Sequence, residues 1–149
     1  MSETLTKSAA RNIFYGGTVF FFVIFVGLVA HSVSTANDIA KVNPITPGVE
    51  AGKHVWERSA CFDCHTLMGE GARFAPELKD VWLRYGGDTD AAAARQNLKD
   101  WIKSQPTRVD DRHQMPHFDF TEAQLDNLVD FLEWNSKVNT QNWPPRKAG

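Results

Sequence analysis

One apolar block near the N-terminus dominates the hydropathy pattern of the chain. Residues 13–33 contain no Asp, Glu, Lys or Arg, and the apolar run at 20–26 leaves no polar face on a helix. Such a helix would be about 32 Å long at about 1.5 Å per residue, which matches a hydrocarbon core of about 30 Å. The block therefore predicts a transmembrane anchor and not an amphipathic surface helix.

After the block, polar residues 34–47 with Pro44 and Pro47 are typical of a linker. Apolar residues then recur at helical spacing, separated by stretches that contain glycine or proline. We expect helices at residues 48–60, 77–85 and 90–103, and a last one that starts at Thr121 as its N-cap. Glycine inside a helix costs about 1 kcal/mol relative to alanine. We therefore interpret Gly52 as a place where another helix crosses closely.

The charges beside the apolar block predict its orientation. Lys7 and Arg11 precede it closely, and the first charges after it are Asp38 and Lys41. Positive charge stays in the cytoplasm, so we expect residues 1–12 to be cytoplasmic. The chain would cross a bacterial inner membrane once and place residues 48–149 in the periplasm as one domain with a polar C-terminal tail.

A cleaved signal peptide is the alternative interpretation of the apolar block. Ser34, Thr35 and Ala36 follow the small-x-small pattern of a cleavage site. However, the block is longer than the 7–15 apolar residues typical of a signal peptide. We therefore favour an uncleaved anchor embedded in the lipid bilayer.

Length and charge limit the function classes. The chain has 149 residues, which is enough for one soluble domain of ordinary size beside the anchor. The formal net charge is −2, and basic residues are interspersed with acidic ones. No basic patch of the kind that binds nucleic acid is visible, so we expect no nucleic-acid partner.

The run Cys61-Phe62-Asp63-Cys64-His65 has the C-x-x-C-H pattern of c-type haem attachment. Two thiols at this spacing can each form a thioether with one haem vinyl group, and the histidine can ligate the iron. A zinc site would need further ligands, a thioredoxin-like dithiol would lie beside a βαβ pattern, and a structural disulfide would not need His65. The run therefore predicts one covalently bound haem c.

Met115 is the candidate for the second axial ligand. It lies far beyond His65 in the sequence, so the chain can cross to the opposite face of the haem, whereas Met68 is too close to His65 to do so. Pro116 stiffens the chain after it. A thioether is a soft ligand that favours reduced iron and raises the potential relative to a nitrogen ligand.

Histidines supply the alternatives and the supporting group. His113 and His117 flank Met115, so bis-histidine ligation is the competing hypothesis, whereas we expect His54 on the surface of the first soluble helix. A ligating histidine usually donates its other ring N–H to an acceptor. The carbonyl of Pro76, or of a neighbour, is the candidate acceptor that would orient His65.

Taken together, these residues resemble a class I cytochrome c domain. The resemblance rests on Gly52-x-x-x-Trp56 before the C-x-x-C-H run, the Met115-Pro116 loop and the final amphipathic helix. It implies an all-α fold in which one N-terminal transmembrane helix is followed by the cytochrome domain. It also implies that the first and last soluble helices cross near Gly52.

A closer resemblance covers nearly the whole chain. The sequence is similar to the small cytochrome c subunit of bacterial, cytochrome c-dependent nitric oxide reductase. The stretches that carry this resemblance are Ala10-Arg11-Asn12, Trp56-Glu57-Arg58, Cys61 to Leu67, Gly69-Glu70-Gly71-Ala72, Phe74-Ala75-Pro76-Glu77-Leu78, Met115-Pro116-x-Phe118 and Asn139-Thr140-Gln141-Asn142-Trp143-Pro144-Pro145. The stretch from Gly69 to Leu78 is far more specific than C-x-x-C-H alone.

This resemblance implies a membrane complex of two different subunits. The large catalytic subunit of the family has b-type haems and an iron centre that couples two NO into N2O and water. The small subunit takes electrons from a soluble periplasmic donor, a cytochrome c or a cupredoxin, and passes them to the b-type haems. We expect this chain to catalyse no chemistry by itself. A membrane-bound cytochrome c that serves another terminal oxidase or acts as a free electron carrier is the alternative, and a haem enzyme or gas sensor is a further one.

Position 73 departs from the family pattern. The family usually has Tyr where this chain has Arg73, in a loop that lies against the large subunit near haem propionates and a bound calcium ion. The resemblance thus implies an interface with the large subunit at Gly71 and Arg73. A guanidinium can pair directly with a propionate or carboxylate but repels a divalent cation, so we expect no calcium here.

Overall fold

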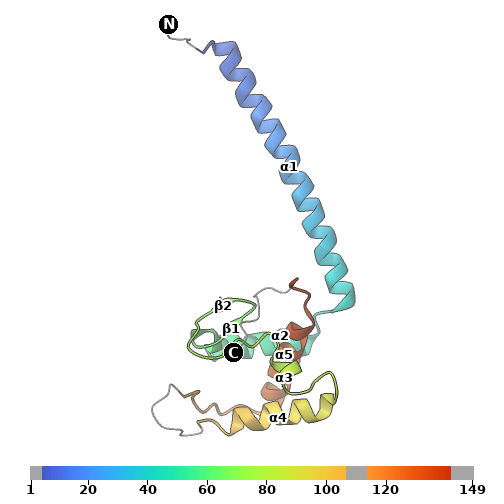
Figure 1. Cartoon of the computed structure of the whole chain (residues 1–149), viewed down its shortest axis with the longest axis vertical. Coiled ribbons are helices and arrows are strands. Elements are labelled where there is room, and N and C mark those ends of the chain that lie inside the picture. The colour runs from blue at the N-terminus through green and yellow to red at the C-terminus, as the bar shows by residue number, and fades with distance from the viewer. Residues whose placement is uncertain (1–4, 107–113, 142–149) are drawn as a thin grey trace. The chain divides into compact units, whose positions relative to one another are not determined.

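The computed structural model describes residues 5–106 and 114–141 of the chain. It divides into two units, Met1–Val42 and Asn43–Gly149, which Figure 1 shows as a long helix and a domain of shorter helices. Two of the sequence-based expectations concern residues outside the described ranges, namely His113 as a ligand and the end of the tail motif from Asn142 to Pro145.

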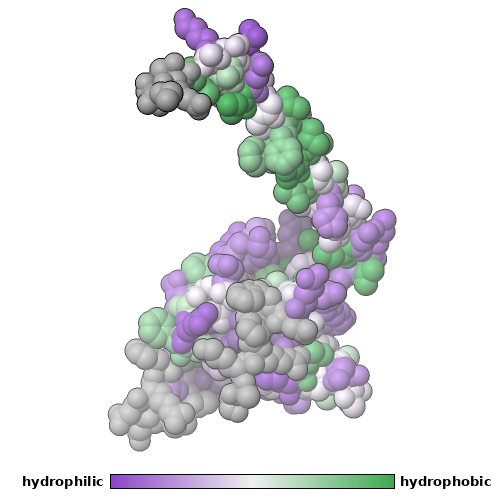
Figure 2. Space-filling model, turned by 45° about the horizontal axis from the view of Figure 1, so that its top comes forward, coloured by the Kyte–Doolittle hydropathy of each residue, from purple (hydrophilic) through white to green (hydrophobic). Residues whose placement is uncertain are grey.

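The first unit is the single helix α1, Lys7–Val42. It is long and apolar enough to cross a membrane, and none of its most apolar stretch is buried inside the protein. Figure 2 shows hydrophobic side chains along its middle and hydrophilic ones toward both ends. The helix includes residues 34–42, which the polarity pattern assigns to the linker. No glycine or proline occurs from residue 28 to residue 43, so the helix continues until Pro44 disfavours helical backbone at the residue before it.

Two crossing helices organise the second unit. Helix α2, Pro47–Arg58, packs on helix α5, Glu122–Lys137. A β-carbon at Gly52 would overlap the carbonyl of Asn127 and the side chain of Phe131. Only glycine allows the two backbones to approach this closely, so the predicted crossing at Gly52 is confirmed.

Short elements complete the domain and its core. The turn η1, Cys61–Asp63, precedes a two-stranded antiparallel hairpin of β1, Thr66–Leu67, and β2, Glu70–Gly71. Helices α3, Val81–Arg84, and α4, Ala91–Lys103, follow. The buried apolar core consists of Val49, Trp56, Val81, Trp82, Ala94, Leu98, Ile102, Leu125, Leu128, Val129, Phe131 and Leu132. The fold is mostly helical, as predicted.

The hairpin and the late start of α3 differ from the expected pattern. The sequence predicts a loop at residues 66–76, but Met68 and Gly69 both have positive φ, 53° and 88°. Two such residues form the tight turn that joins antiparallel strands. The helix expected at residues 77–85 is reduced to α3, because the Glu77 carboxylate accepts the N–H of Lys79 and holds the chain there in a turn.

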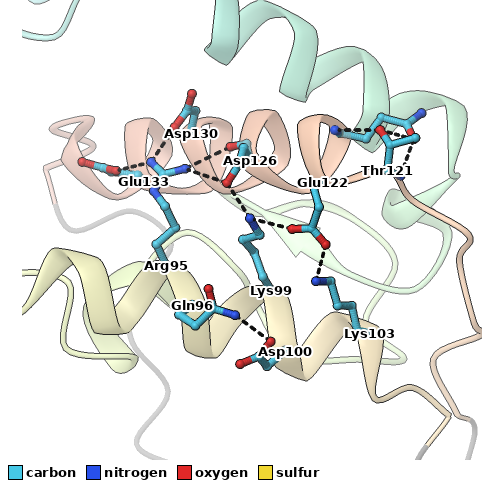
Figure 3. Close-up of polar contacts among 11 residues, drawn as sticks. Arg95, Gln96, Lys99, Asp100, Lys103, Thr121, Glu122, Asp126, Asp130 and Glu133 are labelled. Atoms are coloured by element: carbon cyan, nitrogen blue, oxygen red, sulfur yellow. Dashed lines mark hydrogen bonds and ion pairs between the residues drawn. The ribbon is translucent and has the colours of Figure 1, made fainter.

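A row of ion pairs joins α4 to α5 (Figure 3). The ammonium of Lys99, a residue only 8 % exposed, lies 2.8 Å from Asp126 and 2.9 Å from Glu122. Lys103 also contacts Glu122, and Arg95 contacts Asp130 and Glu133. The hydrogen bond to Asp126 and then that to Glu122 raise the pKa of Lys99. Hydrogen bonds from Lys103 and Lys99 lower the pKa of Glu122, so the charged forms hold the two helices together.

The Glu122→Gln variant should lose stability in a pH-dependent way. The folded-state pKa of Glu122 lies below its ordinary value of 4.5. Its stabilising contribution is therefore present above that value and disappears as the pH falls through the lowered pKa. We expect the difference in unfolding free energy between wild type and variant to be largest near neutral pH and to vanish in strong acid.

Urea unfolding at a series of pH values measures this difference. Asp100→Asn is the matched control, because the Asp100 side chain bonds only to Gln96 on its own helix in the described part of the chain. A Glu122→Gln deficit that is the same at neutral and acidic pH would contradict the assigned role of the carboxylate.

Candidate haem site

The Cys61–His65 run folds into one compact turn. Helix α2 ends at Arg58, and Ala60 takes a left-handed conformation with φ of 53°, which reverses the chain before Cys61. The Cys61 carbonyl accepts the N–H of Cys64 at 3.2 Å and that of His65 at 2.9 Å. These local hydrogen bonds keep both thiols and the imidazole within a single turn.

The two cysteines have different surroundings. Cys61 is partly buried and packs against the core, whereas Cys64 is exposed. Burial raises the pKa of the Cys61 thiol to about 11. At neutral pH this thiol is therefore protonated.

His65 is held in a defined orientation. The residue is 7 % exposed, and its Nδ1 lies 2.8 Å from the carbonyl oxygen of Pro76. A carbonyl only accepts, so Nδ1 carries the proton and donates. Nε2 then keeps its lone pair, which is the state that a ligand to iron requires. The donor set and this tautomer fit a c-type haem.

The segment after the hairpin lies along the Cys61–His65 turn. Ala72 donates its N–H to the Phe62 carbonyl at 2.8 Å, and Ala75 donates to the Cys64 carbonyl at 2.9 Å. Gly71 has a φ of 111°, and a β-carbon there would overlap the His65 carbonyl. The backbone contact thus requires glycine at this position. Arg73 follows as an exposed residue on the same segment.

Glu77 is a structural residue of the site that the sequence pattern did not single out. Its Oε1 accepts the N–H of Met68 at 2.8 Å and that of Lys79 at 3.1 Å. Its Oε2 is buried and has no hydrogen-bond partner in the described part of the chain. Glu77 therefore links the turn of the hairpin to the segment that carries Pro76. No periodicity or spacing indicates such a tertiary contact.

The candidates for the second axial position differ in their contacts. Met115 is partly buried and packs against the core. His117 has both ring nitrogens near acceptors, with Nδ1 3.0 Å from the Gln105 carbonyl and Nε2 3.2 Å from Asp119. His54 is exposed on α2, as expected, beside Glu57. These contacts give His117 partners other than iron and leave Met115 as the better candidate.

Met68 lies in the tight turn of the hairpin, directly beyond the strand that follows His65. Within the described residues, no group of three or more His, Cys, Asp and Glu side chains could hold a metal ion. A zinc site built around Cys61 and Cys64 therefore lacks ligands there.

The C-x-x-C-H turn follows the first of two crossing helices, and its histidine is hydrogen-bonded to a proline carbonyl. Together these features define a cytochrome c domain. Comparison with known proteins agrees, because the cytochrome c family matches residues 49–136.

Curated relatives narrow this class further. The chain is 51 % identical to the C subunit of nitric oxide reductase from Halomonas halodenitrificans and 51 % identical to that from Paracoccus denitrificans. It is 46 % identical to the C subunit from Stutzerimonas stutzeri, and each match covers 100 % of both chains. The chain belongs to the family of nitric oxide reductase C subunits.

The Glu77→Ala variant should destabilise the haem domain. It leaves the N–H groups of Met68 and Lys79 without their acceptor, and an unsatisfied buried donor costs about 1–3 kcal/mol. Glu77→Gln retains an oxygen acceptor and should lose less. Urea unfolding of the haem-loaded protein in detergent measures both changes.

Glu70→Ala serves as the control, because Glu70 is an exposed residue of the same hairpin. We expect it to unfold close to wild type. A Glu77→Ala protein as stable as the Glu70→Ala protein would show that the carboxylate contributes nothing to the loop.

Proposed function

We propose that this chain is the membrane-anchored electron-transfer subunit of a nitric oxide reductase. The observation that carries the proposal is the identity of about half of all residues with C subunits of that enzyme over the full length of both chains. In this proposal a soluble periplasmic donor, a cytochrome c or a cupredoxin, delivers electrons to the chain. The chain passes them to b-type haems of a large catalytic subunit that reduces NO to N2O.

Four residues of the chain would hold one haem c. Cys61 and Cys64 would form the two thioethers, and His65 and Met115 would ligate the iron. When bound, the haem supplies a one-electron Fe(III)/Fe(II) couple. The thioether of Met115 favours the reduced state because it is a soft ligand. The hydrogen bond from Nδ1 to the Pro76 carbonyl fixes the orientation of the His65 ring and therefore the direction of the Nε2 lone pair.

Helix α1 would anchor the chain in the inner membrane by a single pass. The charges of Lys7 and Arg11 support a cytoplasmic N-terminus and a periplasmic haem domain. The exposed segment with Gly71 and Arg73 would face the large subunit, which receives the electrons. There the guanidinium of Arg73 pairs with a propionate or carboxylate, a role that would make calcium unnecessary.

Purification of the complex in mild detergent tests the proposal. We expect the chain to co-purify with a large subunit, and the reduced-minus-oxidised spectrum to show c-type and b-type bands together. The preparation should consume NO when a reduced soluble donor is supplied. A lone c-type monomer without b-type haem would instead support an independent electron carrier.

The Met115→Ala variant tests the ligand assignment. Removal of the thioether should abolish its near-infrared charge-transfer band to ferric iron, lower the midpoint potential and open the iron to carbon monoxide. Met68→Ala is the matched control and should retain the band. An unchanged band and potential in Met115→Ala would refute the assignment.

A further inference from the structure

Gln105, just beyond the end of α4, is a fixed point of the structure because several hydrogen bonds hold it in place. It is only 5 % exposed although its side chain is polar. Its side-chain amide donates to the Trp101 carbonyl at 3.1 Å and contacts the Ser104 hydroxyl at 3.3 Å. Its backbone N–H donates to the Ile102 carbonyl at 3.3 Å. Gln105 is therefore tied to the last turn of α4, which is itself packed in the core.

The imidazole of His117 is bound to this fixed point. Its Nδ1 lies 3.0 Å from the Gln105 backbone carbonyl. Because a carbonyl only accepts, Nδ1 is the donor. Met115 lies between these two residues in the sequence, so the hydrogen bond joins the two ends of the segment that carries it. Closing a loop in this way removes conformations in which its residues are displaced.

Further contacts of this segment lie beyond His117. Phe118 and Phe120 stack with ring centroids 4.9 Å apart, and Phe120 packs against the core. The capping box at Thr121 then starts α5. The chain after His117 is thus fixed by packing and by the start of α5, and the His117–Gln105 bond adds a connection to α4.

We propose that His117 is a positioning residue for the axial ligand, holding Met115 at the iron through its Nδ1 bond to Gln105. This inference rests on the proposed function, in which Met115 ligates the haem. The His117 side chain is 55 % exposed, so its removal deletes little buried surface. Its effect should therefore appear in the iron–thioether bond rather than in the stability of the domain.

Two substitutions test the contacts of the two ring nitrogens of His117 separately. In His117→Asn the amide nitrogen lies near the former place of Nδ1 and can still donate to Gln105. In His117→Gln the amide reaches the former place of Nε2 and can contact Asp119, but it loses the Gln105 bond. Asp119→Asn is a further control, because it changes the Nε2 partner alone, a carboxylate whose side chain is 99 % exposed.

The readout is competition between Met115 and added imidazole at the oxidised c-type haem of the detergent-purified complex. Loss of the thioether charge-transfer band reports displacement of the ligand. Loss of one ordinary hydrogen bond should raise the apparent imidazole affinity of His117→Gln by about 2- to 12-fold. His117→Asn and Asp119→Asn should remain near wild type, and thermal unfolding should change little in all three.

The outcomes distinguish this inference from the function on which it rests. If His117→Gln matches wild type in imidazole affinity while Met115→Ala loses the band, the positioning role is wrong and the ligand assignment stands. Equal weakening in His117→Asn and His117→Gln would also overturn the role of Nδ1. If Met115→Ala keeps the band, the ligand assignment itself fails.

Discussion

The close approach of α2 and α5 at Gly52 is the constraint on which the haem domain depends. Because no side chain separates the backbones there, the two helices form one compact unit with a shared core. The C-x-x-C-H turn directly follows the end of α2, one of the two crossing helices. Trp56, near the end of α2, packs close to both Phe131 of α5 and the ring of His65, with centroid distances of 6.2 Å and 6.4 Å. The helix crossing thus places Trp56 between Phe131 and His65, the proposed proximal ligand.

Local signals explain which parts of the fold could be predicted from the sequence. Helix α5 has both an apolar stripe at helical spacing and a capping residue at Thr121, and its start was predicted correctly. The apolar block of α1 and the attachment motif are likewise local patterns. Gly52 could be interpreted because a glycine inside a helix has a cost that only close packing offsets. The hydrogen bond between His65 and Pro76 was expected because ligating histidines need an acceptor for their second nitrogen.

The remaining features depend on contacts between residues far apart or on rare backbone states. A Met in the left-handed region of a hairpin turn contradicts its residue preferences, so the sequence does not predict the hairpin at Met68. Glu77 and Gln105 act through hydrogen bonds whose partners are set by the tertiary fold. The polarity of residues 34–42 predicts a shorter helix than α1, which continues to Val42 because only Pro44 interrupts the helical backbone. Polarity marks the end of a membrane span and does not mark the end of a helix.

The two axial ligands of the proposed haem site are held by different kinds of structure. His65 belongs to a turn whose hydrogen bonds, from Cys61 to Pro76, all lie within a short stretch of chain that also carries the covalent attachment. Met115 packs against the core, two residues before His117, which is connected to the end of α4 through Gln105. Loss of one contact of His65 would leave several others, including the two proposed thioethers, to hold the ring. In the proposed site, the iron–thioether bond of Met115 would compete with the freedom of its own segment, so changes in the sequence of this segment would adjust the potential without unfolding the domain.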